Sequence, residues 1–161
     1  MWFFMFACYL LTLVSVFLLA VAGCQGYFHF QIMGLNHPSF ALFMMIIYLF
    51  TETLVMFFFV GTGVSIKEYV NEHESDPEYY AHAQSIKRSL YPPMLLNLAL
   101  VMTVFIIGGG VDTLVIPGWL HGLLFIVAFL HFIKTILIQH RCFKANTKII
   151  LTMSGLQNKI I

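Results

Sequence analysis

A glutamate in the middle of an apolar stretch is the residue of this chain that is best placed to do chemistry. Glu52 lies between Thr51 and Thr53, inside the apolar run 40–64, which holds no other charged side chain. A carboxylate in such surroundings costs at least roughly 2–3 kcal/mol unless it is protonated, paired or faces a cavity. Two roles follow for Glu52: a neutral acid that locks a bundle by bonding across helices, or a proton-relay or ligand position.

His131 is the partner that the sequence predicts for Glu52. Each residue lies 13 positions beyond the start of its apolar run, taken at Ser39 and at Gly118. If both runs enter from the same side, a helical rise of 1.5 Å per residue places both side chains ~20 Å deep. A buried Glu and a buried His at one depth relieve each other's burial. We therefore predict a Glu52–His131 pair, with the rotation of the two helices left open.

Histidine is the second theme, because three of the seven histidines gather toward one side of the predicted spans. His37 and His121 lie near the starts of the second and fourth runs, and His29 lies in the connection before the second. A b-type haem in a membrane needs two His side chains on different helices at one depth, with an apolar slot between them. The sequence predicts that a haem, if bound, has His121 as one ligand and His37 or His29 as the other. The alternative interpretation makes these residues interfacial or capping side chains.

Other motifs for catalysis are weak or absent from the sequence. Glu78 and His82 stand four positions apart and could share a metal ion, but this spacing alone is weak evidence. The three cysteines are scattered and form no C-x-x-C pair. The chain has no phosphate-binding loop, no zinc-protease motif and no serine-hydrolase motif. The sequence therefore assigns no catalytic residue and leaves the metal unknown. It favours a non-catalytic or electron-transfer subunit over a stand-alone enzyme.

The elements that must position these residues are four long apolar runs, at 2–23, 40–64, 94–116 and 118–138. Each is about long enough to cross a hydrocarbon layer of ~30 Å. Charged residues make up only 9% of the chain, against about 25% in soluble domains. Val21–Cys24 resembles a lipoprotein cleavage site, but the first run is longer than a signal peptide's apolar region, so we expect a true span. The sequence predicts an all-α integral membrane protein, one four-span domain over residues 1–161.

The distribution of basic residues predicts the orientation of the four spans. All eight lie between spans 2 and 3 or in span 4 and the tail that follows it: Lys67, Lys87, Arg88, Lys134, Arg141, Lys144, Lys148 and Lys159. Basic residues concentrate on the cytoplasmic side of membrane proteins. We therefore expect both termini, the inner loop 67–91 and the tail 141–161 on that side.

The inner loop is the only strongly polar segment of the chain. Asp76 followed by Pro77 is typical of a helix start, and apolar residues then recur along one helical face up to Leu90. Pro92 and Pro93 are expected to end this helix before the third span. The pattern predicts a short amphipathic helix on the inner membrane surface.

Two classes of function follow from these observations. A net charge of +1 without a basic arm argues against a nucleic-acid partner, so the expected partners are the lipid bilayer and other membrane subunits. In outline the architecture resembles the small four-span haem-bearing anchors of respiratory complexes. This resemblance implies a subunit of an electron-transfer complex, with a b-type haem near the outer side. The alternative is a stand-alone proton or small-solute carrier or channel built around Glu52 and His131, against which the lack of an internal repeat counts.

The orientation leads to a labelling prediction. Cysteines introduced into the inner loop 67–91 should react only with membrane-permeant thiol reagents, because this segment holds basic residues that stay on the cytoplasmic side. Labelling of intact cells with permeant and impermeant reagents is the measurement. Reaction of these sites with an impermeant reagent added from outside would contradict the predicted topology.

Overall fold

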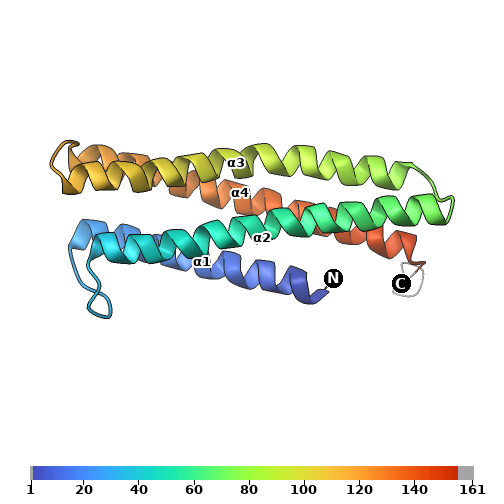
Figure 1. The fold of residues 1–161 in the computed structure, drawn as a ribbon, viewed down its shortest axis with the longest axis horizontal. Helices are drawn as coiled ribbons and strands as arrows, with labels where there is room; N and C mark the ends of the chain where they lie inside the picture. Colours follow the sequence, from blue (N-terminus) through green and yellow to red (C-terminus); the bar gives the residue numbers. More distant parts are fainter. Residues whose placement is uncertain (1, 156–161) are drawn as a thin grey trace.

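The chain folds into four long helices that pack side by side. The computed structural model describes residues 2–155. Within that range it contains no β-strand, and its helices are α1 (Trp2–Phe28), α2 (His37–Glu72), α3 (Glu78–Asp112) and α4 (Gly118–Met153). Each helix packs against the next along the chain, and α4 closes the ring against α1 (Figure 1). All four are long and apolar enough to cross a membrane, so the predicted all-α fold of four such helices is confirmed.

Successive helices run in opposite directions. The α1–α2 and α3–α4 connections lie at one end of the bundle (Figure 1, left), which we call the outer end. The α2–α3 connection lies at the opposite, inner end, together with the beginning of α1 and the end of α4. The names follow the orientation that the basic residues predict. α2 and α4 therefore run in the same direction and lie diagonally across the bundle.

The separate amphipathic helix predicted for the inner loop is not present. The helix begins two residues later than Asp76, at Glu78, with Pro77 rather than Asp76 as its N-cap. The Asp76 Oδ1 accepts a hydrogen bond of 2.8 Å from the Glu78 N–H. The helix then continues through Pro92 and Pro93 to Asp112, so the segment expected to be separate forms the first turns of α3. Prolines remove backbone donors, but packed apolar helices tolerate them. Leu90 and Met94 are fully buried on either side of the prolines, and this packing keeps the helix continuous.

The third and fourth helices end at positions other than the apolar runs suggest. α3 ends at Asp112 rather than at residue 116, because the chain turns at Leu114 with a φ of 61°. The N–H groups of Val115 and Ile116 both bond back to the carbonyl of Gly110. α4 continues well past residue 138, so most of the predicted inner tail is helical. Lys159 of that tail lies outside the described residues.

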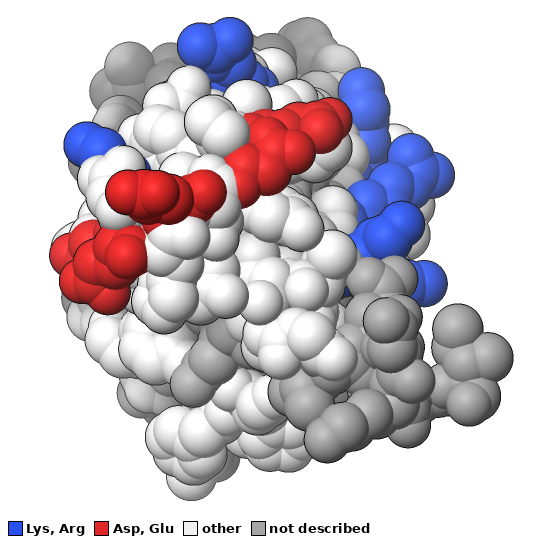
Figure 2. Space-filling model, turned by 90° about the vertical axis from the view of Figure 1, so that its right-hand side faces the viewer, with Lys and Arg blue, Asp and Glu red and all other residues white. Residues whose placement is uncertain are grey.

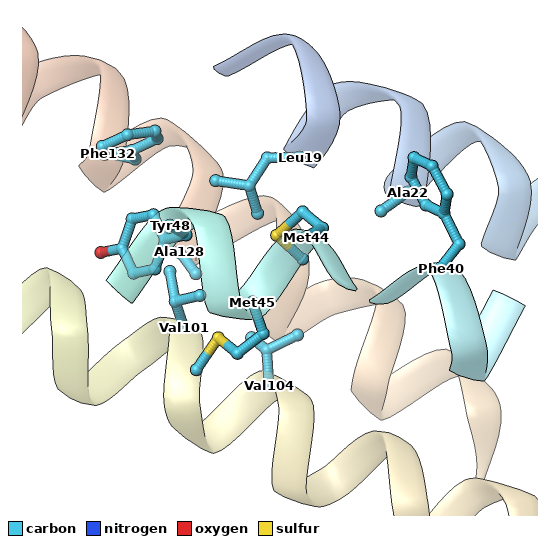
Figure 3. Packing of buried hydrophobic residues seen from close by; sticks show 10 residues of the cluster. All are labelled: Leu19, Ala22, Phe40, Met44, Met45, Tyr48, Val101, Val104, Ala128 and Phe132. Atoms are coloured by element: carbon cyan, nitrogen blue, oxygen red, sulfur yellow. The ribbon is translucent and has the colours of Figure 1, made fainter. Parts of the chain in front are cut away.

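Three apolar clusters fill the bundle, and a polar layer separates the two larger ones, an outer core and an inner core. The third is small and consists of Ile66, Ala83 and Ile149. The outer core includes Phe40, Met45, Tyr48 and Phe132 and draws on all four helices (Figure 3). The inner core comprises Cys8, Val55, Phe58, Phe59, Leu90, Met94, Cys142 and Phe143. On every helix the residues between the two cores include buried polar side chains. This polar layer consists of Thr12, Ser15, Thr51, Glu52, Asn97, Thr135 and Gln139.

Removing an aromatic ring from the outer core should destabilise the bundle. Phe132 is fully buried and meets the Tyr48 ring edge-on, with 5.2 Å between ring centroids. Phe132→Ala should lower the free energy of unfolding by about 3–5 kcal/mol, through lost contacts and a residual cavity. Phe57→Ala is the matched control, because the Phe57 side chain is 64% exposed and faces outward. Denaturation of both variants in detergent checks this, and equal stabilities would contradict it.

Candidate functional site

The carboxyl group of Glu52 is bound by an amide from the diagonal helix. The Nε2 of Gln139 donates to Glu52 Oε2 at 2.9 Å and to Oε1 at 3.2 Å. Both side chains are buried, and Gln139 carries no charge. Over residues 2–155, no Lys or Arg lies within ion-pair distance of Glu52. Because a buried carboxylate without a cation is costly, we expect the neutral acid in the resting state.

His131 takes a different amide partner. Its Nδ1 lies 3.0 Å from Asn97 Oδ1 on α3, and the Asn97 amide nitrogen donates to the Tyr48 hydroxyl at 2.7 Å. Asn97 and Tyr48 are buried, whereas His131 is only half-buried. The structure therefore does not bring Glu52 and His131 together, and each is bonded to an amide of its own.

The register of α2 against α4 explains this separation. His37 meets His121, Thr62 meets Asn146 and Tyr69 meets Met153, so the residue numbers of these three facing pairs differ by 84. Ser39 thus faces the level of Leu123 rather than that of Gly118. The prediction assumed that Ser39 and Gly118 lie at the same depth. In the structure these two residues differ in depth by five residues, or ~7.5 Å. Glu52 consequently lies near the level of residue 136, where the long side chain of Gln139 reaches it.

The polar layer also joins α1 to the bundle. The Ser15 hydroxyl donates to Thr51 Oγ1 at 2.9 Å, and the Thr51 hydroxyl donates to the Ile47 carbonyl at 2.8 Å. Thr12 bonds within α1, to the carbonyl of Cys8. Side chains of all four helices thus take part in hydrogen bonds at this level. Asn97 is the residue of α3 that does so.

At the outer end the structure brings two of the predicted ligands together. His37 and His121 lie with their ring centroids 6.1 Å apart and their planes at 72°. Asn36 caps α2 by accepting a hydrogen bond from the Ser39 N–H, with Pro38 in the first turn, which places His37 at the first position of the helix. The Nδ1 atoms of both rings are buried and have no hydrogen-bond partner among the described residues.

Each of the two imidazoles packs against a glycine of a neighbouring helix. A Cβ at Gly26 would lie 3.2 Å from His37 Cε1, and one at Gly108 would lie 3.1 Å from His121 Cε1. Both distances are tighter than an ordinary van der Waals contact, so a larger residue would push the ring. α1 and α3 therefore supply the backbone surfaces that set the positions of the two rings.

A cavity of about 1000 Å³ opens around these rings. Its walls are mainly apolar and aromatic and include Met44, Phe105, Phe125 and Phe129. His29 also lines the cavity, but the ring contact found there joins His37 to His121. Asp112 is the only charged residue among the lining residues, so no described Lys or Arg faces the space.

The described residues contain no cluster of three or more His, Cys, Asp or Glu side chains arranged to hold a metal ion. Glu78 and His82, the weak metal candidates, form an exposed ion pair of 3.3 Å on the first turn of α3. The two histidines at the outer cavity are therefore suited to a metal that brings its own remaining ligands, as haem iron does.

Sequence reasoning missed the residues that complete these sites. Asn97 is the only strongly polar side chain in the middle of its span, a signal that could have identified it as an interhelical partner. Gln139 falls on the same half of its helix as His131 and Thr135, a pattern that predicts a side chain facing the bundle, but its pairing with Glu52 depended on the register of α2 against α4. Gly26 and Gly108 carry no signal in a single sequence, because their role depends on which ring lies opposite.

Comparison of the chain with protein-family models, with curated proteins and with solved structures finds no match. The outer cavity and the polar layer are therefore the features from which a function must be inferred. The cavity offers two imidazoles to a ligand, whereas the polar layer is closed on itself by amide hydrogen bonds.

The Glu52–Gln139 contact leads to a prediction about stability. Gln139→Leu should lower the free energy of unfolding by about 1–3 kcal/mol, because the buried Glu52 carboxyl loses its donor. Glu52→Gln should be tolerated, since an amide is isosteric with the neutral acid and still accepts from Gln139.

The double variant Glu52→Leu/Gln139→Leu is the control for this contact. Replacing both partners by apolar groups can be nearly neutral, so it should be more stable than Gln139→Leu alone. Unfolding of the four proteins in one detergent is the measurement. Wild-type stability of Gln139→Leu would show that the contact does not support the bundle.

Proposed function

We propose that the outer cavity binds a b-type haem between His37 and His121, and that the chain is a small electron-transfer subunit of a larger membrane complex. The observation that carries this proposal is the meeting of two imidazoles from separate helices, 6.1 Å apart, beside a largely apolar cavity. This spacing is compatible with two metal–nitrogen bonds of roughly 2 Å to one ion.

The residues around the cavity fit such a group in shape and polarity. The volume of about 1000 Å³ and the aromatic walls suit a flat apolar macrocycle. The two carboxylates of a bound haem would find only neutral donors in the cavity, such as Asn36 and Trp119. We therefore expect these carboxylates to remain hydrated. Asp112 adds a negative charge beside the site. An unneutralised acidic group favours the oxidised, more positive form of a nearby metal centre.

The chemistry proposed here is limited to electron transfer. A bis-His haem supplies a one-electron carrier when bound, with no open position for a substrate. His37 and His121 would hold the iron, and Gly26 and Gly108 set the positions of their rings. The apolar walls exclude water, which holds the metal in a low-dielectric environment. No residue in this arrangement needs to act as an acid or a base.

The environment of the protein is part of the same proposal. The four helices span a lipid bilayer, with both termini and the α2–α3 connection on the cytoplasmic side. Other membrane subunits are the expected partners, because a single carrier near one surface needs a donor and an acceptor. The haem would then lie toward the outer side.

A proton or small-solute carrier built around Glu52 and His131 is the second candidate. Its appeal is the presence of two ionisable groups in a bundle that contains few. The hydrogen bonds weigh against it: Glu52 is bonded to Gln139 and His131 to Asn97. Amides donate and accept hydrogen bonds but are not among the side chains that transfer protons. The haem proposal is therefore favoured.

An absorption spectrum tests the proposal directly. The protein purified after expression with added haem precursor should show a Soret band of a bis-His haem. Replacing His121 by Leu, or His37 by Leu, should abolish that spectrum, because each removes one axial ligand. Circular dichroism should show the helices of both variants intact.

Two control variants locate the haem within the bundle. His29→Ala and His131→Leu should both keep the spectrum, since neither ring meets the His37–His121 pair. Loss of the band in His29→Ala alone would move the second ligand to the α1–α2 connection. If the protein never shows a Soret band but copurifies with other membrane subunits, the haem proposal is wrong. The chain would then be a structural accessory subunit.

A further inference from the structure

A second concave site lies near the inner end, on the seam between α1 and α4. This groove has a volume of about 320 Å³, and Met5 and Tyr9 of α1 line one side of it. Phe143, Thr147 and two lysines of α4 line the other. The Thr147 hydroxyl lies 3.6 Å from the Met5 sulfur, and the Tyr9 hydroxyl lies 2.9 Å from His140 Nδ1. The floor of the groove is thus apolar.

The two lysines, Lys144 and Lys148, add positive charge to one rim of this groove. They stand four positions apart on the same face of α4, with Arg141 one turn before them, and all three are exposed. The one ion pair within the described chain joins Glu78 and His82, so these cations have no acidic partner. Figure 2 shows the acidic side chains of this end as a band across the face, with the basic side chains in groups around it.

The depth of the groove places it where a membrane has its inner headgroups. Phe143 lies 25 residues after Gly118, or ~37 Å along α4, and Lys148 lies ~45 Å along it. A bilayer measures ~30 Å across its hydrocarbon and about 40–45 Å with its headgroups. An apolar floor that begins near the acyl boundary and a cationic rim at the headgroup level match the two parts of one lipid molecule.

We propose that this groove binds an anionic phospholipid of the inner leaflet. Lys144 and Lys148 hold the phosphate, with Arg141 adding to the local potential. One acyl chain lies over Met5, Tyr9 and Phe143. Anionic lipids are attracted to such basic sites on the cytoplasmic side. The bound acyl chain would also contact both α1 and α4 and so improve the packing between these two helices, which is weak. This site is independent of the outer cavity and of any haem.

Native mass spectrometry of the full chain, after incubation with phosphatidylglycerol and phosphatidylcholine of identical acyl chains, tests this site. The wild type should retain phosphatidylglycerol in preference to phosphatidylcholine. Lys144→Gln/Lys148→Gln should lower the occupancy by phosphatidylglycerol roughly tenfold, because two phosphate-binding charges are lost. Lys67→Gln/Arg88→Gln removes the same charge from α2 and α3 at the inner end and should leave the occupancy unchanged.

Two further measurements separate a lipid from other occupants. Met5→Trp should reduce retention of the lipid without a change of charge, because the larger side chain fills the apolar floor. Inorganic phosphate at millimolar concentration should not displace the lipid. Equal retention of the two lipids by the wild type, or an unchanged preference in the Lys144/Lys148 variant, would overturn the proposal. Displacement by phosphate alone would assign the site to a free anion and would equally overturn the lipid.

Discussion

A carboxyl group in the centre of an apolar bundle, without a cation beside it, must find a hydrogen-bond donor on another helix. Glu52 finds this donor in Gln139 across the diagonal of the bundle. Ser15 of α1 and Asn97 of α3 are also buried polar side chains, and each donates a hydrogen bond to a hydroxyl group of α2. Turning any one helix by a single residue, or 100°, would carry its polar side chain away from its partners. The polar layer therefore sets the rotation of all four helices, which general apolar packing on both sides leaves loosely defined.

The same register fixes the outer cavity. Three facing pairs at the two ends of α2 and α4 share an offset of 84 residues, so the register that places Glu52 near Gln139 also places His37 opposite His121. The relative position of the two imidazoles thus depends on the geometry of the whole bundle. Their unpartnered Nδ1 atoms fit this, because a buried polar atom left without a partner in one state often has one in another.

The sequence was informative where long apolar runs and rare polar residues decided the structure. Four helices, a helix start within two residues of Asp76 and the gathering of His37 and His121 at one end could be predicted from it. The partner of Glu52 could not, because an error of about one turn in relative depth changes which side chain lies opposite. The continuity of α3 through Pro92 was missed for a related reason: local preference favours a break there, and only packing against other helices prevents it.

An uninterrupted α3 has a mechanical consequence. One rod of 35 residues, ~52 Å long, carries Ala83 in the inner contacts, Asn97 in the polar layer and Gly108 beneath the His121 ring. A helix interrupted at Pro92 would let its first turns, near the α2–α3 connection, swing without disturbing the rest. Here a twist or axial shift applied near the α2–α3 connection must be transmitted along the rod to Gly108, and hence to an imidazole at the opposite end of the bundle.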